Sequence, residues 1–185
     1  MKETLRIIGV LTSVCLVCAF LLALVYSRAA EKIEVNQNQR LKTAIANLAP
    51  GAEKVEEVSL GDSTIFKLSD KKQKLIGYAF LAQGQGYQDK IAILAVIDVS
   101  FGKLSGIEIL ESSETPGLGG KIQETDFLKQ FKQLPVNNGL ECVKTEAQAD
   151  GQIKAITGAT VSSRAVVDTI NKKLVVLKSE IKNLK

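Results

Sequence analysis

The sequence predicts an α+β protein in which a mainly antiparallel sheet packs with helices and follows one N-terminal transmembrane helix. Residues 7–26 contain neither a charge nor a proline and are long enough to cross a bilayer as a helix. Short strand-like segments follow, with turn residues but no long helix between them, which favours antiparallel pairing. From Val161 onward, apolar residues recur every three or four positions, as in a one-sided helix.

The apolar stretch near the start is longer than the hydrophobic region of a signal peptide. Residues 1–30 are therefore expected to form a retained membrane anchor, although Ser27-Arg28-Ala29 faintly resembles a cleavage site. We expect residues 31–185 to form one domain, because a chain of this length can bury a single core. This domain is expected to be extracytoplasmic.

The charges that flank the apolar stretch predict its orientation. Lys2, Arg6 and the amino terminus precede it, whereas Arg28 and Lys32 follow it. Positive groups favour the cytoplasmic side, so this small excess predicts a single-pass protein with a cytoplasmic N-terminus.

The segment Glu31 to Leu48 is expected to be helical, ending at Pro50-Gly51, and to continue the membrane helix outward as a stalk. The expected strands are Lys54–Leu60, Thr64–Leu68, Leu75–Leu81, Ile91–Val99 and Leu104–Leu110. Residues 91–97 are apolar throughout rather than alternating, which predicts a central strand covered on both faces by helices from the two ends of the domain. A short helix is expected around Asp126 to Phe131.

The composition excludes several classes of chemistry. The chain has no histidine, which removes the commonest general base, the usual haem ligand and most zinc ligand sets. Cys15 and Cys18 lie inside the apolar stretch and are interpreted as small apolar residues, so Cys142 has no disulfide partner in the domain. A formal net charge of +4 does not indicate nucleic-acid binding. We therefore expect no metal site, and any redox centre must be an organic cofactor.

The most informative stretch is Ala155-Ile156-Thr157-Gly158-Ala159-Thr160-Val161-Ser162-Ser163, where hydroxyls and a glycine meet the start of the last predicted helix. A helix N-terminus presents free backbone N–H groups and the positive end of the macrodipole, both of which suit a phosphate. The alternative is that Thr157 or Thr160 merely caps the helix.

A second stretch, Glu114-Thr115-Pro116-Gly117-Leu118-Gly119-Gly120-Lys121, places three glycines within four residues. Such a backbone is unobstructed, so a flat ligand or its phosphate can approach closely. The spacing is not that of a nucleotide-binding P-loop, because Ile122 rather than Ser or Thr follows Lys121. The alternative is an ordinary Gly/Pro turn after a strand.

Together the two stretches resemble the FMN-binding domain family, specifically the G subunits of Rnf-type membrane electron-transport complexes and the related C subunits of sodium-pumping quinone reductases. The likeness extends to Gly86-Tyr87, the segment Ile91 to Val99, the Gly102-Lys103 turn and the N-terminal anchor. In this family FMN is carried on the last threonine of a Ser/Thr-Gly-Ala-Thr motif through a phosphoester. Thr160 matches that threonine.

The resemblance implies a covalent FMN on Thr160 and no catalytic residue or metal in this chain. The residues implied around the phosphate and the flavin are Thr157, Gly158, Ala159, Val161, Ser162, Glu114, Thr115, Gly117, Leu118, Gly119 and Lys121. The chain departs from the family at Lys154, where an acidic residue commonly lies six positions before the acceptor threonine.

Several of these residues also have an ordinary structural interpretation. Glu114 either lowers the flavin reduction potential or holds its loop through backbone N–H groups. Lys121 either stabilises reduced, anionic flavin or is an exposed lysine. Ser162 and Ser163 either contact the phosphate or only form hydrogen bonds at the N-terminus of the helix. Tyr78 and Tyr87 either stack on the flavin or are ordinary packing residues of the strands.

The resemblance implies an electron-transfer subunit of an ion-translocating oxidoreductase complex of the inner membrane, between ferredoxin and NAD. It also implies other redox subunits as partners and a separate flavin transferase for maturation. Two other functions stay open on the residues alone: a membrane-tethered module that binds a phosphate-bearing ligand, and an assembly subunit without redox activity.

Overall fold

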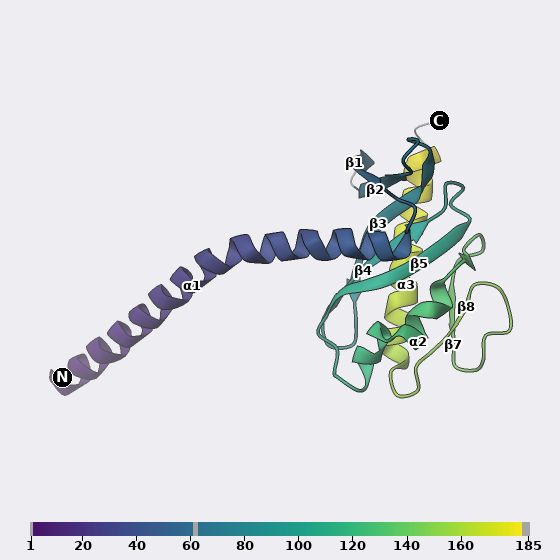
Figure 1. Cartoon of the computed structure of the whole chain (residues 1–185). Coiled ribbons are helices and arrows are strands. Elements are labelled where there is room, and N and C mark those ends of the chain that lie inside the picture. Colours follow the sequence, from purple (N-terminus) through teal and green to yellow (C-terminus); the bar gives the residue numbers. More distant parts are fainter. Residues whose placement is uncertain (1, 61–62, 183–185) are drawn as a thin grey trace. The chain divides into compact units, whose positions relative to one another are not determined.

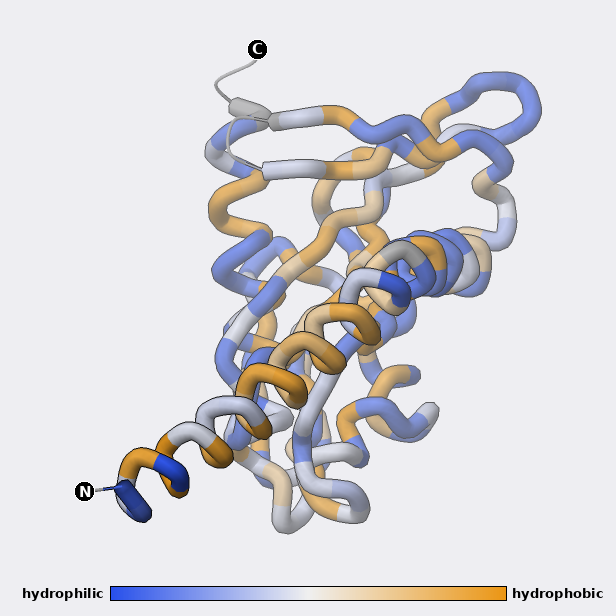
Figure 2. Tube along the Cα trace, turned by 90° about the vertical axis from the view of Figure 1, so that its left-hand side faces the viewer, coloured by the Kyte–Doolittle hydropathy of each residue, from blue (hydrophilic) through white to orange (hydrophobic). Residues whose placement is uncertain are grey.

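A computed structural model describes residues 2–60 and 63–182, and these separate into two compact units. The first unit ends at Arg40 and consists of most of helix α1 (Lys2–Leu48). After its polar first turn, this unit is mainly apolar and then becomes polar again (Figure 2). Of the helices in the described part of the chain, α1 alone is long and apolar enough to span a membrane. The helix continues without a break from the apolar stretch through the expected stalk.

The second unit, from Leu41 onward, contains a six-stranded sheet with the order β1-β2-β3-β4-β5-β6 (Figure 1). The strands are β1 (Lys54–Leu60), β2 (Ser63–Ser69), β3 (Leu75–Gln85), β4 (Lys90–Ile97), β5 (Lys103–Ser112) and β6 (Leu134–Pro135). Every neighbouring pair is antiparallel. The predicted antiparallel sheet packed with helices is therefore confirmed.

The remaining elements follow the sheet along the chain. They are η1 (Gly119–Gln123), α2 (Thr125–Leu128), η2 (Lys129–Phe131), β7 (Glu141–Val143), β8 (Gln152–Lys154) and α3 (Thr160–Lys182). Strands β7 and β8 pair in parallel as a separate two-stranded sheet, which the sequence patterns did not predict. The polar segment before the last helix thus contains a strand.

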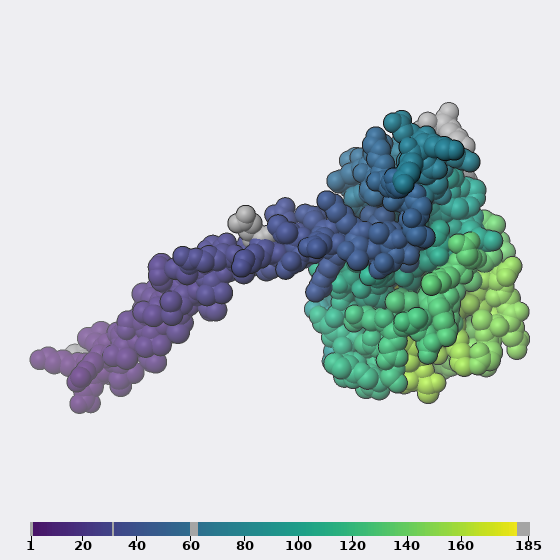
Figure 3. Space-filling view, in the orientation of Figure 1, coloured from purple at the N-terminus to yellow at the C-terminus, as the bar shows by residue number. Residues whose placement is uncertain are grey.

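Strand β4 is covered on both faces by apolar side chains. Ile91, Ile93 and Ala95 belong to one core cluster, together with the buried side of α3. Leu94 and Val96, which alternate with them, belong to a second cluster with Ala44 and Ile45 from the last turns of α1. Figure 3 shows these turns of α1 packed against the domain in space-filling form.

We predict that Ile93→Ala lowers the free energy of unfolding by about 2–4 kcal/mol, because it leaves a cavity in a packed core. Ile93 is fully buried, whereas Val55 on the edge strand β1 is 42% exposed. Val55→Ala is therefore the control, with an expected change of less than about 1 kcal/mol. Urea unfolding of the full chain in detergent measures both changes. Equal losses in the two variants would contradict the core that we describe.

Candidate functional site

Helix α3 begins at Thr160, as the periodicity predicts, and the turn before it is held by Ser163. The Ser163 Oγ accepts a hydrogen bond from the N–H of Ile156 at 3.0 Å and donates one to the carbonyl of Ala159 at 3.0 Å. The N–H of Ala159 closes the turn by donating to the carbonyl of Ile156 at 2.9 Å. Neither Thr157 nor Thr160 makes a side-chain hydrogen bond to the described residues. The side-chain hydrogen bonds that hold this turn therefore come from Ser163 and not from either threonine.

The four hydroxyl groups near the helix start fall into two pairs. Those of Ser162 and Ser163 are buried, and each donates its single proton inside the protein, to Glu114 and to Ala159 respectively. Thr157 is exposed and Thr160 is half-buried. The hydroxyls available for an external phosphate are consequently those of the two threonines.

The first turn of α3 is also electropositive. The N–H groups at the start of a helix lack intrahelical acceptors and form the positive end of its dipole. Arg164 follows Thr160 by four residues and so lies on the same side of the helix. Both residues line a surface pocket of 240 Å³ with Gln85, Val161, Ala165 and Asp168. A phosphate at Thr160 would therefore meet N–H donors and a guanidinium in a pocket that also contains one carboxylate.

The glycine-rich loop lies against this helix start. Within the loop, the carbonyl of Thr115 accepts hydrogen bonds from the N–H groups of Leu118, at 3.2 Å, and Gly120, at 2.9 Å. A methyl group built on Gly158 would lie 3.6 Å from the Leu118 side chain. Leu118 and Val161 are 52% and 57% exposed, so apolar side chains flank the threonine motif at the surface.

A second pocket, of 270 Å³, adjoins the first residue of the motif, Thr157. Lys121 and Thr157 line it together with Glu124, Phe127 and Lys154. The structure thus places Lys121 in the pocket of Thr157, whereas Thr160 lines the pocket that contains Arg164.

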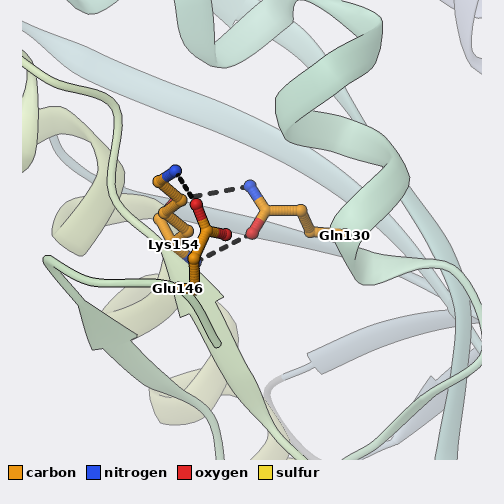
Figure 4. A network of polar contacts seen from close by, with 3 residues as sticks. All are labelled: Gln130, Glu146 and Lys154. Atoms are coloured by element: carbon orange, nitrogen blue, oxygen red, sulfur yellow. Dashed lines mark hydrogen bonds and ion pairs between the residues drawn. The ribbon is translucent and has the colours of Figure 1, made fainter. Parts of the chain in front are cut away.

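Lys154, the departure from the family pattern, is held by two partners (Figure 4). Its N–H donates to Gln130 Oε1 at 2.8 Å, and Gln130 Nε2 donates back to the Lys154 carbonyl at 3.3 Å. The Lys154 ammonium forms an ion pair with Glu146. Gln130 therefore fixes the end of β8, six residues before Thr160.

Glu114 is a buried carboxylate that joins three segments. Its Oε1 accepts hydrogen bonds from the N–H groups of Tyr87, at 2.7 Å, and Gln88, at 3.0 Å, and its Oε2 accepts one from Ser162 Oγ at 2.6 Å. The side chain is only 6% exposed. Glu114 does accept backbone N–H bonds, but from the β3–β4 turn rather than from its own loop.

The two tyrosines that could stack on a flavin have different surroundings. The rings of Tyr78 and Phe101 lie 5.0 Å apart at the core, whereas Tyr87 is 70% exposed beside Glu114.

Burial raises the pKa of the Cys142 thiol above its ordinary value. The positive charge of Arg164 opposes this rise, and the negative charge of Asp168 adds to it. Among the described residues no group of His, Cys, Asp and Glu side chains could hold a metal ion.

Sequence reasoning missed three contributors to the site: Arg164, Gln85 and the amide groups of Tyr87 and Gln88. Arg164 carries a detectable signal, because its spacing of four from Thr160 puts both on one helix face. The amide groups of Tyr87 and Gln88 could not be found in this way, because every residue except proline has a backbone N–H. Their partner, Glu114, also lies 26 or 27 residues away in the sequence.

Comparisons with known proteins agree with this architecture. The model of the FMN-binding domain family matches residues 86–175. The G subunit of the ion-translocating oxidoreductase complex of Methanosarcina acetivorans is 32% identical over 178 residues, covering 92% of each chain. The G subunit of the proton-translocating ferredoxin:NAD(+) oxidoreductase complex of Clostridium ljungdahlii is 30% identical over 84% of this chain and 82% of its own.

Two solved structures share the fold. The C subunit of the Na(+)-translocating NADH-quinone reductase of Parabacteroides distasonis has a TM-score of 0.62 at 17% identity, covering 80% of this chain and 92% of that one. Shewanella oneidensis NqrC has a TM-score of 0.53 at 19% identity, covering 66% and 65%. The expected family resemblance is thereby confirmed.

We predict that Ser163→Ala lowers the free energy of unfolding by about 1–2 kcal/mol, because it removes one acceptor and one donor that hold the turn before α3. Thr157→Ala is the matched control, with an expected change within about 0.5 kcal/mol, since its exposed hydroxyl bonds to no described residue. Chemical denaturation of both variants tests this. A larger loss for Thr157→Ala than for Ser163→Ala would show that the threonine is the cap.

Proposed function

The chain belongs to the family of G subunits of ion-translocating oxidoreductase complexes, with an FMN-binding domain, and we propose that FMN is attached covalently to Thr160 of this electron-transfer subunit. The observation that carries the proposal is the division of hydroxyls at the start of α3. Ser162 and Ser163 are engaged inside the protein, while Thr160 begins α3 and lines a surface pocket with Arg164.

The described residues fit a flavin mononucleotide. The first N–H groups of α3 and the Arg164 guanidinium suit the phosphate, which carries negative charge even as a diester. The exposed side chains of Leu118 and Val161 offer apolar contact to the ring system. The glycines of the loop from Thr115 to Gly120 leave its backbone with little side-chain obstruction to a flat ligand.

The proposed attachment is a phosphoryl transfer from a flavin phosphate donor: the Thr160 oxygen forms an O–P bond, one P–O bond of the donor breaks, and the displaced oxygen group leaves with the threonine proton. The chain then gains the mass of FMN less one water. When bound, flavin supplies one- and two-electron chemistry. The residues of the chain hold the phosphate, orient the ring and fix one cofactor to each polypeptide, which suits a dedicated carrier among the subunits of a complex.

We propose that a separate flavin transferase forms the ester, as the family resemblance implies; the chain has no histidine, the commonest general base. Lys154 replaces the acid that is common at this position in the family, but its ion pair with Glu146 keeps a carboxylate next to it. We propose that Glu146 serves in place of the missing acid during recognition by the transferase.

We predict that the native chain keeps its yellow fluorescence after denaturing electrophoresis and that Thr160→Ala abolishes it. Intact mass spectrometry should show the mass of FMN less water on the wild type and no such gain on Thr160→Ala. Thr64→Ala is the matched control and should keep the modification, because Thr64 is an exposed threonine on β2, outside both stretches. The variants are produced in the native host, so that the maturation enzyme is present.

Each alternative function gives a different result in this experiment. A mass gain that persists in Thr160→Ala would contradict the assignment of the residue. Fluorescence that is lost on denaturation would mean that any flavin is noncovalent. A colourless wild type of unaltered mass would favour a phosphate-ligand module or an assembly subunit instead.

We also propose that α1 crosses the inner membrane once, with the N-terminus in the cytoplasm and the domain outside. The charges around the apolar stretch support this orientation. We predict that a protease added to intact spheroplasts digests the domain, whereas in inverted vesicles the domain is protected. Protection in spheroplasts together with digestion in inverted vesicles would reverse the assignment.

A further inference from the structure

The carboxylate of Glu114 has an unusual position, because it is buried without a cationic partner among the described residues. It instead accepts the three hydrogen bonds from Tyr87, Gln88 and Ser162. Burying a charged carboxylate is costly unless donors satisfy it. These donors come from the β3–β4 turn and from α3, while Glu114 itself precedes the glycine-rich loop.

Two glycines leave the space that the carboxylate occupies. A Cβ atom on Gly86 would overlap Glu114 Oε1, and a Cβ atom on Gly119 would overlap Glu114 Oε2. The same atom on Gly119 would lie 2.7 Å from Ser162 Oγ. The backbone at Gly86 and Gly119 therefore approaches the Glu114 carboxylate more closely than any residue with a side chain would allow.

The bond to Ser162 connects this cluster to the start of α3. Ser162 follows Thr160 by two residues in the same helical turn, so anchoring Ser162 fixes the backbone of that turn and with it the position of Thr160. Glu114 is separated from Thr115 by a single peptide bond. One carboxylate thus sets the position of the threonine motif relative to the glycine-rich loop.

We propose that Glu114 is a positioning residue, which holds Thr160 in the geometry that modification requires and does not contact the flavin itself. This inference rests on the proposed function, because it concerns modification of Thr160. Both carboxylate oxygens already accept hydrogen bonds from the protein, and the side chain is almost fully buried, so it offers no surface to a ligand. Glu114 is thereby distinguished from Leu118 and Arg164, which are exposed at the site.

The test compares Glu114→Ala and Glu114→Gln in the full chain, produced together with the flavin transferase of the host. Leu68→Ala is the matched control for lost stability, because Leu68 is fully buried in the core cluster on the other face of the sheet. Three quantities are measured: the melting temperature, the fraction of chains with the FMN mass on residue 160, and amide hydrogen exchange at Tyr87 and Gln88. Exchange is measured in chains that also carry Thr160→Ala, so that the cofactor does not affect it.

We expect Glu114→Ala to lower the modified fraction strongly after a short induction, and to speed exchange at Tyr87 and Gln88 about tenfold or more, since bonds to a charged acceptor are lost. Glu114→Gln should recover most of the modification, because an amide oxygen still accepts from the two N–H groups and its NH₂ group can donate to Ser162 Oγ. Leu68→Ala should lower the melting temperature but leave the modified fraction close to that of the wild type.

Two results would overturn the inference. One is normal modification of Glu114→Ala. The other is a loss of modification in Leu68→Ala as large as in Glu114→Ala at a similar melting temperature, which would assign the effect to stability alone. A wild type without FMN would contradict the proposed function instead. In that case the exchange rates still test whether Glu114 holds the β3–β4 turn. Unchanged rates at Tyr87 and Gln88 in Glu114→Ala would refute that role.

Discussion

The packing of β4 between two apolar layers is the constraint on which the rest of the domain depends. Alternate side chains of this strand enter different core clusters, one containing α3 and the other the last turns of α1. Helix α3 is consequently fixed along its buried face by residues such as Val166 and Ile170. Its first turn is then placed next to the glycine-rich loop, so that a rigid core positions the threonine motif.

The sequence predicted the parts of the fold that depend on local pattern. The apolar run of β4, the period of α3 and the turn residues between strands indicated the antiparallel sheet and the start of α3 at Thr160. Strands β7 and β8 were missed because each has three residues and their parallel pairing joins segments about ten residues apart. So short a pairing leaves no periodicity to detect.

The site was predictable in its motifs but not in its contacts. Both motifs lie side by side, and their likeness to a known family supplied the prediction that Thr160 is the acceptor, which stays a prediction. The roles of the hydroxyls were not predictable, because Ser162, Ser163 and Thr160 differ only in the direction that each side chain takes from the helix. The hydrogen bond from the Tyr87 N–H to Glu114 joins residues 27 positions apart. Its donor is a backbone amide, so no pattern of residue types predicts it.

The shape of the surface supports the covalent linkage that we propose. The two pockets beside the threonine motif measure 240 and 270 Å³, below the roughly 300–1,000 Å³ of pockets that enclose a small molecule. A flavin held there by contact alone would bury little of its surface and dissociate readily. In the proposed function, the ester replaces enclosure as the source of retention. Under the same proposal, an open site would let the ring approach a neighbouring redox centre closely, whereas a deep pocket would separate the two.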